Sequence, residues 1–103
     1  MAKGVMVVFS NPIDSSRESE YNDWYTNVHL PDLLKLPGFV GARRFRVLDK
    51  DADKRYLAVY ELEADDLNEI TEVIGKAVEA GGIRMTEAIE LEPLAFVRLC
   101  EEL

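Results

Sequence analysis

The apolar positions of this chain fall into short runs, four of which have the length and composition of β-strands. Residues 5–9 form an apolar, β-branched run that ends at a Ser-Asn-Pro turn, which predicts a buried strand. Residues 39–48 alternate well enough for a second strand, and the polar residues 49–54 predict a hairpin connection to a third strand over residues 56–62. The fourth strand is expected over residues 93–99.

The first helix is expected between the first two strands. Ser15 followed by Glu18 fits a capping box, and the aromatic and apolar residues that recur after it predict a helix over residues 16–29. A proline disfavours helical geometry in the residue before it. We therefore expect this helix to break just before Pro31, with a further turn over residues 31–34.

The second helix is expected between the third and fourth strands. Asp66 fits the cap position, an amphipathic stripe runs from Leu67 to Val78, and Gly81 follows where a left-handed residue is wanted. The element order β-α-β-β-α-β predicts an α+β, ferredoxin-like fold, with a four-stranded antiparallel sheet and two helices on one face. We expect residues 1–103 to form this one domain.

The strands also predict a partner. A sheet with helices on one face and water on the other should alternate apolar and polar residues. Residues 5–9, 57–60 and 94–97 are instead apolar on both faces. A single chain would expose a large apolar surface, which proteins in water avoid. We therefore expect a two-fold homodimer that forms through the open sheet face.

Composition places the chain in a broad class. It has 103 residues, 48% of them hydrophobic and 31% charged, which suits one domain with a single modest core. Cys100 is the only cysteine, so no intrachain disulfide is possible and a reducing compartment is expected. No apolar run approaches the roughly 18 residues of a membrane helix, and the N-terminus does not resemble a signal peptide. We expect a cytoplasmic protein.

The charge of the chain is negative and unevenly distributed. The net charge is −8, and the acidic excess falls in residues 61–103. An acidic surface repels phosphate backbones and anionic lipids. Neither nucleic acid nor a membrane is therefore expected as a partner.

His29 is the only histidine and lies near the end of the predicted first helix. Its unperturbed pKa allows proton exchange near neutral pH, so any general acid–base role falls to it first. Tyr25 lies one helical turn earlier on the same face, and Trp24 flanks it. Two interpretations remain open, a capping histidine beside an aromatic core and an acid–base group at the edge of an aromatic-lined cavity.

Other candidate ligand contacts lie on the strands. Arg44 can hold a carboxylate or enolate oxygen, or it can pair with surface acids, which is the use we favour. Tyr56 and Tyr60 share one face of the third strand, either as a pocket wall with a hydroxyl donor or as a packing pair. Phe9 and Asn11, at the end of the first strand, are further candidates, although Asn11 equally suits a plain turn.

Several chemistries lack their residues. One histidine and one cysteine, far apart in the sequence, give no metal cluster. The chain has no G-x-G-x-x-G, no P-loop and no G-x-S-x-G motif, so nucleotide binding and serine hydrolysis have no support. We expect neither a metal nor a cofactor.

The segment over residues 21–45 resembles the EthD-like branch of the dimeric α+β barrel superfamily. The shared pattern is Trp24, then His29 followed by x-Pro, then the Pro-Gly-Phe turn that ends at Phe39. The resemblance implies a ferredoxin-like dimer with a pocket between helices and sheet, and makes His29 the candidate acid–base group. Haem-degrading relatives carry their key histidine on the second helix, where this chain has none.

The leading hypothesis is a small cofactor-independent enzyme that performs isomerase, cyclase or lyase proton transfer on a hydrophobic, carbonyl-bearing molecule. His29 moves the proton, and Tyr60, Tyr25 or an arginine stabilises the oxyanion. Two alternatives are a non-catalytic dimeric module that binds a small apolar or aromatic ligand or a partner protein, and a cofactor-free monooxygenase. The candidate substrate contacts are Phe9, Asn11, Trp24, Tyr25, Arg44 and Tyr56.

Overall fold

A four-stranded antiparallel sheet and a layer of helices make up the computed structural model, which describes residues 1–90 and 97–103. The strands are β1 (Ala2–Ser10), β2 (Phe39–Arg46), β3 (Tyr56–Ala64) and β4 (Val97–Glu101), in the sheet order β2-β3-β1-β4. The helical segments are η1 (Ser15–Arg17), α1 (Glu18–Trp24), η2 (Tyr25–His29), α2 (Leu30–Leu34), η3 (Leu67–Glu69) and α3 (Ile70–Glu79). The predicted β-α-β-β-α-β fold is confirmed.

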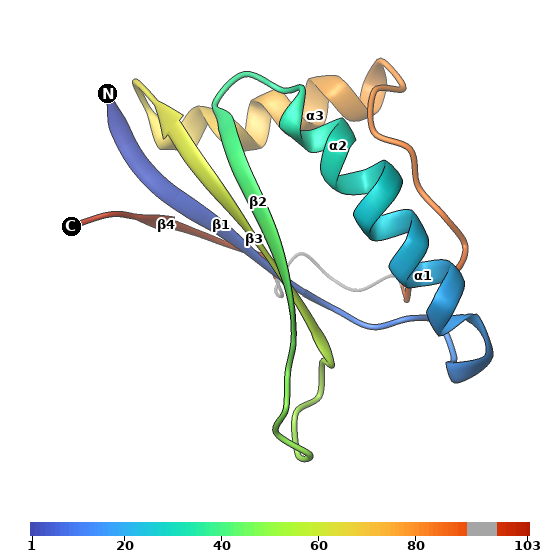
Figure 1. The fold of residues 1–103 in the computed structure, drawn as a ribbon. Coiled ribbons are helices and arrows are strands. Elements are labelled where there is room, and N and C mark those ends of the chain that lie inside the picture. Colours follow the sequence, from blue (N-terminus) through green and yellow to red (C-terminus); the bar gives the residue numbers. More distant parts are fainter. Residues whose placement is uncertain (91–96) are drawn as a thin grey trace.

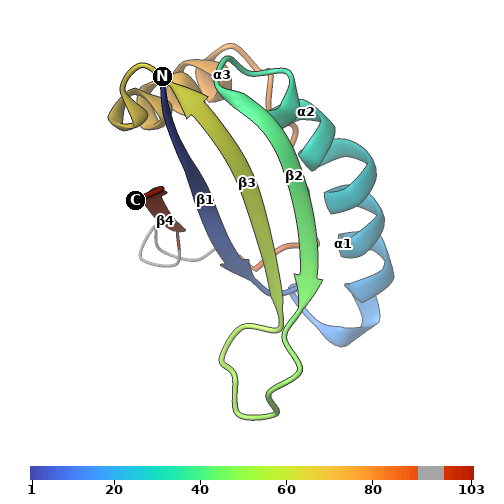
Figure 2. The ribbon, with the colours of Figure 1, turned by 60° about the vertical axis from the view of Figure 1, so that its left-hand side comes forward.

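The helices cover one face of the sheet. The segment from α1 to α2 runs along the sheet beside β2, and α3 lies across the end of the sheet near the N-terminus (Figures 1 and 2). Paired residues of neighbouring antiparallel strands point to the same face, and Met6 pairs with Tyr60, which pairs with Ala42. The even-numbered residues of β1 and β3 therefore face the helices. The largest fully buried side chains are Tyr21, Tyr25, Tyr60, Leu62 and Ile70.

The first helix does not break before Pro31, so that prediction is wrong. Leu30 keeps helical dihedral angles, and α1, η2 and α2 follow one another without interruption. The reason is that η2 is a π-helical turn, in which the Leu30 N–H donates to the Tyr25 carbonyl. A proline normally clashes with the carbonyl four residues before it. A widened turn just before Pro31 absorbs the misfit, as π-bulges do inside α-helices.

The observed N-cap is the predicted residue at the second helix and a different residue at the first. Asp66 caps the second helix by accepting from the Asn68 N–H at 2.9 Å, and Gly81 follows its end with a φ of +75°. At the first helix the cap is Asp14 and not Ser15, because the Asp14 carboxylate accepts from the Arg17 N–H at 3.2 Å. The positive end of the helix dipole also stabilises a carboxylate at this position.

The fourth strand is described only in part. Residues 93–96 of its predicted span lie outside the described residues, and β4 extends to Glu101, which pairs with Gly4 of β1. None of the helices in residues 1–90 and 97–103 has the length and hydropathy to span a membrane.

Candidate functional site

His29 lies against two aromatic rings of its own helix. Its imidazole stacks on Trp24, with ring centroids 4.6 Å apart and planes 27° apart, and meets the Tyr25 ring edge-on at 5.1 Å. In a regular α-helix residues five apart in sequence are turned about 140° from each other. The π turn η2 rotates His29 back over Trp24, so the local backbone and not the side-chain spacing alone creates this contact.

The imidazole is partly buried and keeps one nitrogen unbonded. Within residues 1–90 and 97–103, Nδ1 of His29 is buried without a hydrogen-bond partner. Burial lowers the pKa of His29 to about 4, because it disfavours the charged form. The carboxylate of Asp32 acts in the opposite direction but is outweighed. The side chain is therefore neutral at pH 7 and holds a lone pair that no described group uses.

Tyr60 is the second buried polar group without a partner. It lies on β3, is 0% exposed, and its hydroxyl has no hydrogen-bond partner in the part of the chain that the structure describes. Burial raises its pKa above the usual range, and the neighbouring phenol of Tyr25 adds to the effect. Burial also raises the pKa of Tyr25, to about 12. Both phenols thus stay neutral and can donate.

Arg44 reaches from β2 into a cage of tyrosine rings. Its guanidinium carbon lies 4.5 Å from the centroid of the Tyr25 ring and 5.4 Å from those of Tyr21 and Tyr56. These distances are in the range of cation–π contacts. Arg44 forms no ion pair within the described ranges, whereas its neighbour Arg43 contacts Glu61 at 4.0 Å. The expected pairing with a surface acid is therefore wrong for Arg44, because the helix side of β2 offers tyrosines instead.

Tyr56 and Ser10 hold the outer part of the aromatic cluster in hydrogen bonds. The Tyr56 hydroxyl donates to the Glu18 carboxylate and accepts from the Asn22 side-chain amide at 3.2 Å. The hydroxyls of Ser10 and Tyr21 are 2.5 Å apart. These phenols are satisfied, which distinguishes them from Tyr60.

Six of the eight predicted site residues lie in one cluster under the helices, and two do not. Phe9 pairs with Leu57 on the opposite face of the sheet. Asn11 fastens the connection between β2 and β3, since its amide donates to the Asp53 carbonyl at 2.9 Å and its oxygen accepts from the Arg55 N–H at 2.7 Å. The structure thus places Asn11 in a structural contact and Phe9 away from His29.

The sequence did not reveal a hydrogen-bonded ion pair near His29, between Asp32 and Arg84. Asp32 is 4% exposed and accepts three hydrogen bonds from Arg84, from its backbone N–H, Nε and Nη2, at 2.8–3.0 Å. The Trp24 indole N–H donates to the Arg84 carbonyl at 3.1 Å. These contacts hold the pKa of the Asp32 carboxyl far below its usual range. Since the partners lie 52 residues apart, no local pattern reveals them.

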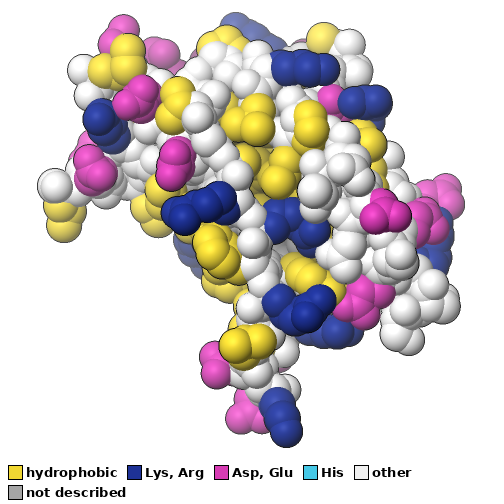
Figure 3. Space-filling model, in the orientation of Figure 1, with side chains coloured by type: hydrophobic (Ala, Val, Ile, Leu, Met, Phe, Trp, Pro, Cys, Tyr) yellow, Lys and Arg dark blue, Asp and Glu magenta, His cyan; other side chains and the backbone are white. Residues whose placement is uncertain are grey.

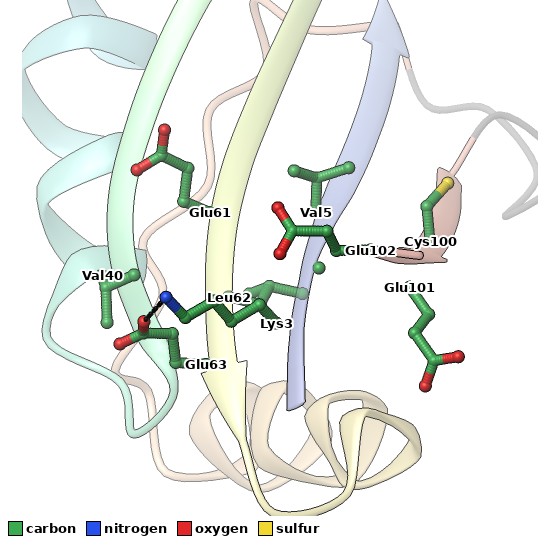
Figure 4. Close-up of a pocket in the computed structure, with 10 residues that line it drawn as sticks. Lys3, Val5, Val40, Glu61, Leu62, Glu63, Cys100, Glu101 and Glu102 are labelled. Atoms are coloured by element: carbon green, nitrogen blue, oxygen red, sulfur yellow. Dashed lines mark ion pairs between the residues drawn. The ribbon is translucent and has the colours of Figure 1, made fainter. Parts of the chain in front are cut away.

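Two surface clefts lie elsewhere on the molecule. One, of about 470 Å³, is on the sheet around Lys3, Val5, Glu61 and Glu63, and Figure 4 shows the Lys3 ammonium paired with Glu63 across it. The other, of about 720 Å³, is lined by Ile13, Met85, Thr86, Glu87, Ile89 and Glu90. Neither cleft is lined by His29, Tyr60 or Arg44. No three His, Cys, Asp or Glu side chains of the described ranges are placed to hold a metal ion.

Comparison with known proteins places the chain in a family. The family model "Domain of unknown function (DUF4286)" matches residues 6–84. The chain belongs to this family. No curated protein shows significant similarity to it.

Two solved structures share its fold. An ethyl tert-butyl ether D (EthD) family protein from Bacillus halodurans C-125 is 16% identical, with a TM-score of 0.61 over 100% of both chains. A candidate monooxygenase from Shewanella loihica PV-4 is 14% identical, with a TM-score of 0.63 over 96% of this chain and 93% of its own. The predicted resemblance to EthD-like proteins is confirmed at the level of the fold.

Proposed function

We propose that this DUF4286 protein is a cofactor-independent enzyme that moves a proton next to a carbonyl group of a hydrophobic small molecule. One observation carries the proposal. In the described part of the chain, the two buried side-chain atoms that lack a hydrogen-bond partner are Nδ1 of His29 and the hydroxyl of Tyr60. A buried polar group without a partner is costly to stability. The two groups are an unprotonated base and a neutral donor, the pair that enolisation needs.

The proposed reaction uses each group in the state that the protein imposes. Neutral His29 takes the proton from the carbon beside the carbonyl, so a C–H bond breaks and an N–H bond forms on the imidazole. The electron pair moves to the carbonyl oxygen, and the hydroxyl of Tyr60 donates a hydrogen bond to that developing oxyanion. Return of the proton from the imidazolium to another carbon completes an isomerisation without any redox change.

The fluorescence of Trp24 can report ligand binding. Trp24 is the only tryptophan, is 8% exposed and stacks on His29. Because Nδ1 of His29 is buried, a substrate has to displace a neighbouring side chain to touch it. Trp24 fluorescence should therefore change when a substrate binds.

Solvent-deuterium exchange tests the proposal directly. In D2O, the wild-type protein should exchange the protons beside the carbonyl of cyclic hydrophobic ketones and lactones, as measured by proton NMR. Tyr60→Phe removes only the hydroxyl and should slow exchange about 10²–10³-fold, the usual cost of one oxyanion donor. A folded wild-type protein that catalyses no exchange across this panel contradicts the proposal and leaves the non-catalytic binding module.

A second candidate is a cofactor-free monooxygenase, favoured by the description of the Shewanella loihica structure. The same proton removal would then produce an electron-rich substrate anion that reacts with oxygen. An oxygen electrode distinguishes the two. Oxygen consumption with a phenolic substrate favours the oxygenase, and exchange without oxygen consumption favours the isomerase-type reaction.

We also propose that the enzyme works as a homodimer joined through the sheet face away from the helices. Val5, Val7 and Phe9 of β1 pair with residues of β3 on this face, including Leu57 and Val59. They are only half-buried, and no helix of the described residues covers them (Figure 2). Phe45, on the same face, is 42% exposed. A second copy of the chain presents the same apolar strand residues, so it is the occupant that suits this face.

Light scattering after size exclusion tests the dimer. The wild type should have twice the 11.7 kDa mass of one chain. Leu57→Lys puts a charge in the middle of the apolar face and should give single chains. Leu48→Lys adds the same charge at an exposed position outside the strands and should leave the dimer intact. A wild-type mass of one chain contradicts this proposal.

A further inference from the structure

Three arginine side chains lie around the ring of Tyr56. The guanidinium groups of Arg44, Arg46 and Arg55 lie 5.4, 5.9 and 5.9 Å from its centroid. Against these three charges the described residues supply one carboxylate in contact, that of Glu18, which pairs with Arg55 at 3.0 Å. The chain as a whole has a net charge of −8. A local excess of positive charge is thus the opposite of what its composition favours.

Arg44 is the innermost of the three and is held by uncharged groups. Nη1 donates to the Thr26 hydroxyl at 3.1 Å and to the Asn22 backbone carbonyl at 3.5 Å, and Nη2 donates to the Asn22 side-chain oxygen at 2.9 Å. A guanidinium has five N–H donors in a fixed fork. These contacts therefore orient the group firmly and leave donors and its full charge available.

The position of Arg44 matches a ligand contact better than a packing contact alone. It lies where α1 faces the edge strand β2, and Lys and Arg side chains sit there among hydrophobic side chains in the seam between the two elements (Figure 3). Cation–π contacts with tyrosines explain why one arginine is tolerated there. Arg46, which is exposed and has no ion pair among the described residues, adds a second guanidinium group over the Tyr56 ring. Charge-assisted binding of an anion explains both.

We infer that the ligand carries a carboxylate that binds to Arg44, with its planar body among the tyrosine rings. This inference rests on the proposed function, because it extends the same site. The Tyr25 ring connects the proposed anion site with the proposed base, since it contacts Arg44 at 4.5 Å and His29 at 5.1 Å. A planar carboxylic acid whose carboxylate meets Arg44 would place its far end towards His29 and Tyr60. The substrate class is therefore a hydrophobic keto or lactone acid.

Binding of benzoate and of benzamide, a neutral molecule of the same shape, tests the inference. Titration followed by Trp24 fluorescence and by NMR should show that wild-type protein binds benzoate about tenfold or more tightly than benzamide. Arg44→Gln should abolish this preference, and Arg44→Lys should keep part of it. The matched control is Lys50→Gln, because it removes one positive charge from an exposed position in the connection between β2 and β3, outside the strands. It should bind benzoate as the wild type does.

The outcomes separate this inference from the proposed function. Wild-type protein that binds benzamide as well as benzoate, or Lys50→Gln that loses as much as Arg44→Gln, overturns the anion site. Exchange of neutral ketones would then still support the enzyme. Specific benzoate binding without exchange of any substrate overturns the enzyme and supports a site for carboxylate ligands. If Arg44→Gln fails to fold, Arg46→Gln is the second variant, and it should weaken benzoate binding but not benzamide binding.

Discussion

Replacing His29 by asparagine should slow proton exchange beside a carbonyl group about 10²–10⁴-fold, the usual contribution of a positioned general base. Asparagine keeps a polar atom near the place of Nδ1 but cannot take up a proton. The exchange rate should fall without a matching loss of ligand affinity, because the imidazole acts in the proton-transfer step and not in holding the ligand. Trp24 fluorescence measures binding in the same samples, and proton NMR in D2O measures exchange.

The control for this variant lies on the same π turn. Asn27 is exposed, two residues before His29, and Asn27→Ala should leave the exchange rate unchanged. Thermal unfolding of both variants shows whether the fold persists. A folded His29→Asn protein that exchanges at the wild-type rate would remove His29 from the reaction and favour its structural interpretation, stacked on Trp24.

The pH dependence gives His29 a second signature. Its pKa of about 4 lies below the ordinary 6.5, so the base form is present at pH 5, and kcat/KM should fall only near pH 4. The unfolded chain binds this proton below pH 6.5 and the folded chain does not. Stability should therefore decrease as the pH falls from about 6.5 to 4, by up to about 3 kcal/mol. Urea unfolding across this window, with His29→Asn as the reference, isolates this contribution.

The fold was predictable because its signals are local. The apolar runs, the Asp66 cap and the glycine after the second helix each act within a few residues, and together they fix the element order. The histidine with its two aromatic neighbours was found for the same reason. The uninterrupted helix at Leu30 was not, because a π turn depends on how the backbone adjusts to packing and leaves no side-chain pattern.

The rest of the site depends on contacts between distant segments. Arg44 meets Asn22 across 22 residues and Asp32 meets Arg84 across 52. An arginine on a strand pairs with an acid or enters an aromatic cage according to which face it occupies. That face follows from the strand register, in which Arg44 pairs with Ala58 on the helix side. Phe9 shows the converse, since the same register turns it away from the helices.

Arg84→Ala should destabilise the fold more than Asp32→Asn, although both break the same ion pair. The Asp32 side chain is 4% exposed, whereas that of Arg84 is 61% exposed. Without Arg84, a buried carboxylate loses its cation and keeps only a backbone N–H donor. Without Asp32, the guanidinium remains in water. A buried charge left without its partner is the costly case, so the melting temperature of Arg84→Ala should fall by about 10 °C or more.

Acid should partly rescue Arg84→Ala, which an ordinary loss of packing would not show. In the wild type the pKa of Asp32 lies well below normal because of its bonds to Arg84, so stability is lost as the pH falls towards that pKa. In the variant, burial without the cation raises the pKa of Asp32, and protonation of the carboxyl relieves the uncompensated charge. The melting temperatures of variant and wild type should therefore converge between pH 7 and about pH 4.

The exposed pair of Arg17 and Glu20, 2.7 Å apart on the first helix, supplies the control. Arg17→Ala should change the melting temperature only slightly, because solvent screens such pairs. Equal losses in Arg17→Ala and Arg84→Ala, or a loss in Arg84→Ala that does not shrink in acid, would show that Asp32 is not the buried charge that ties this loop to the helix. The Trp24 indole, which donates to the Arg84 carbonyl, reports the same event through its fluorescence. Its emission should shift as the loop detaches from the helix beside His29.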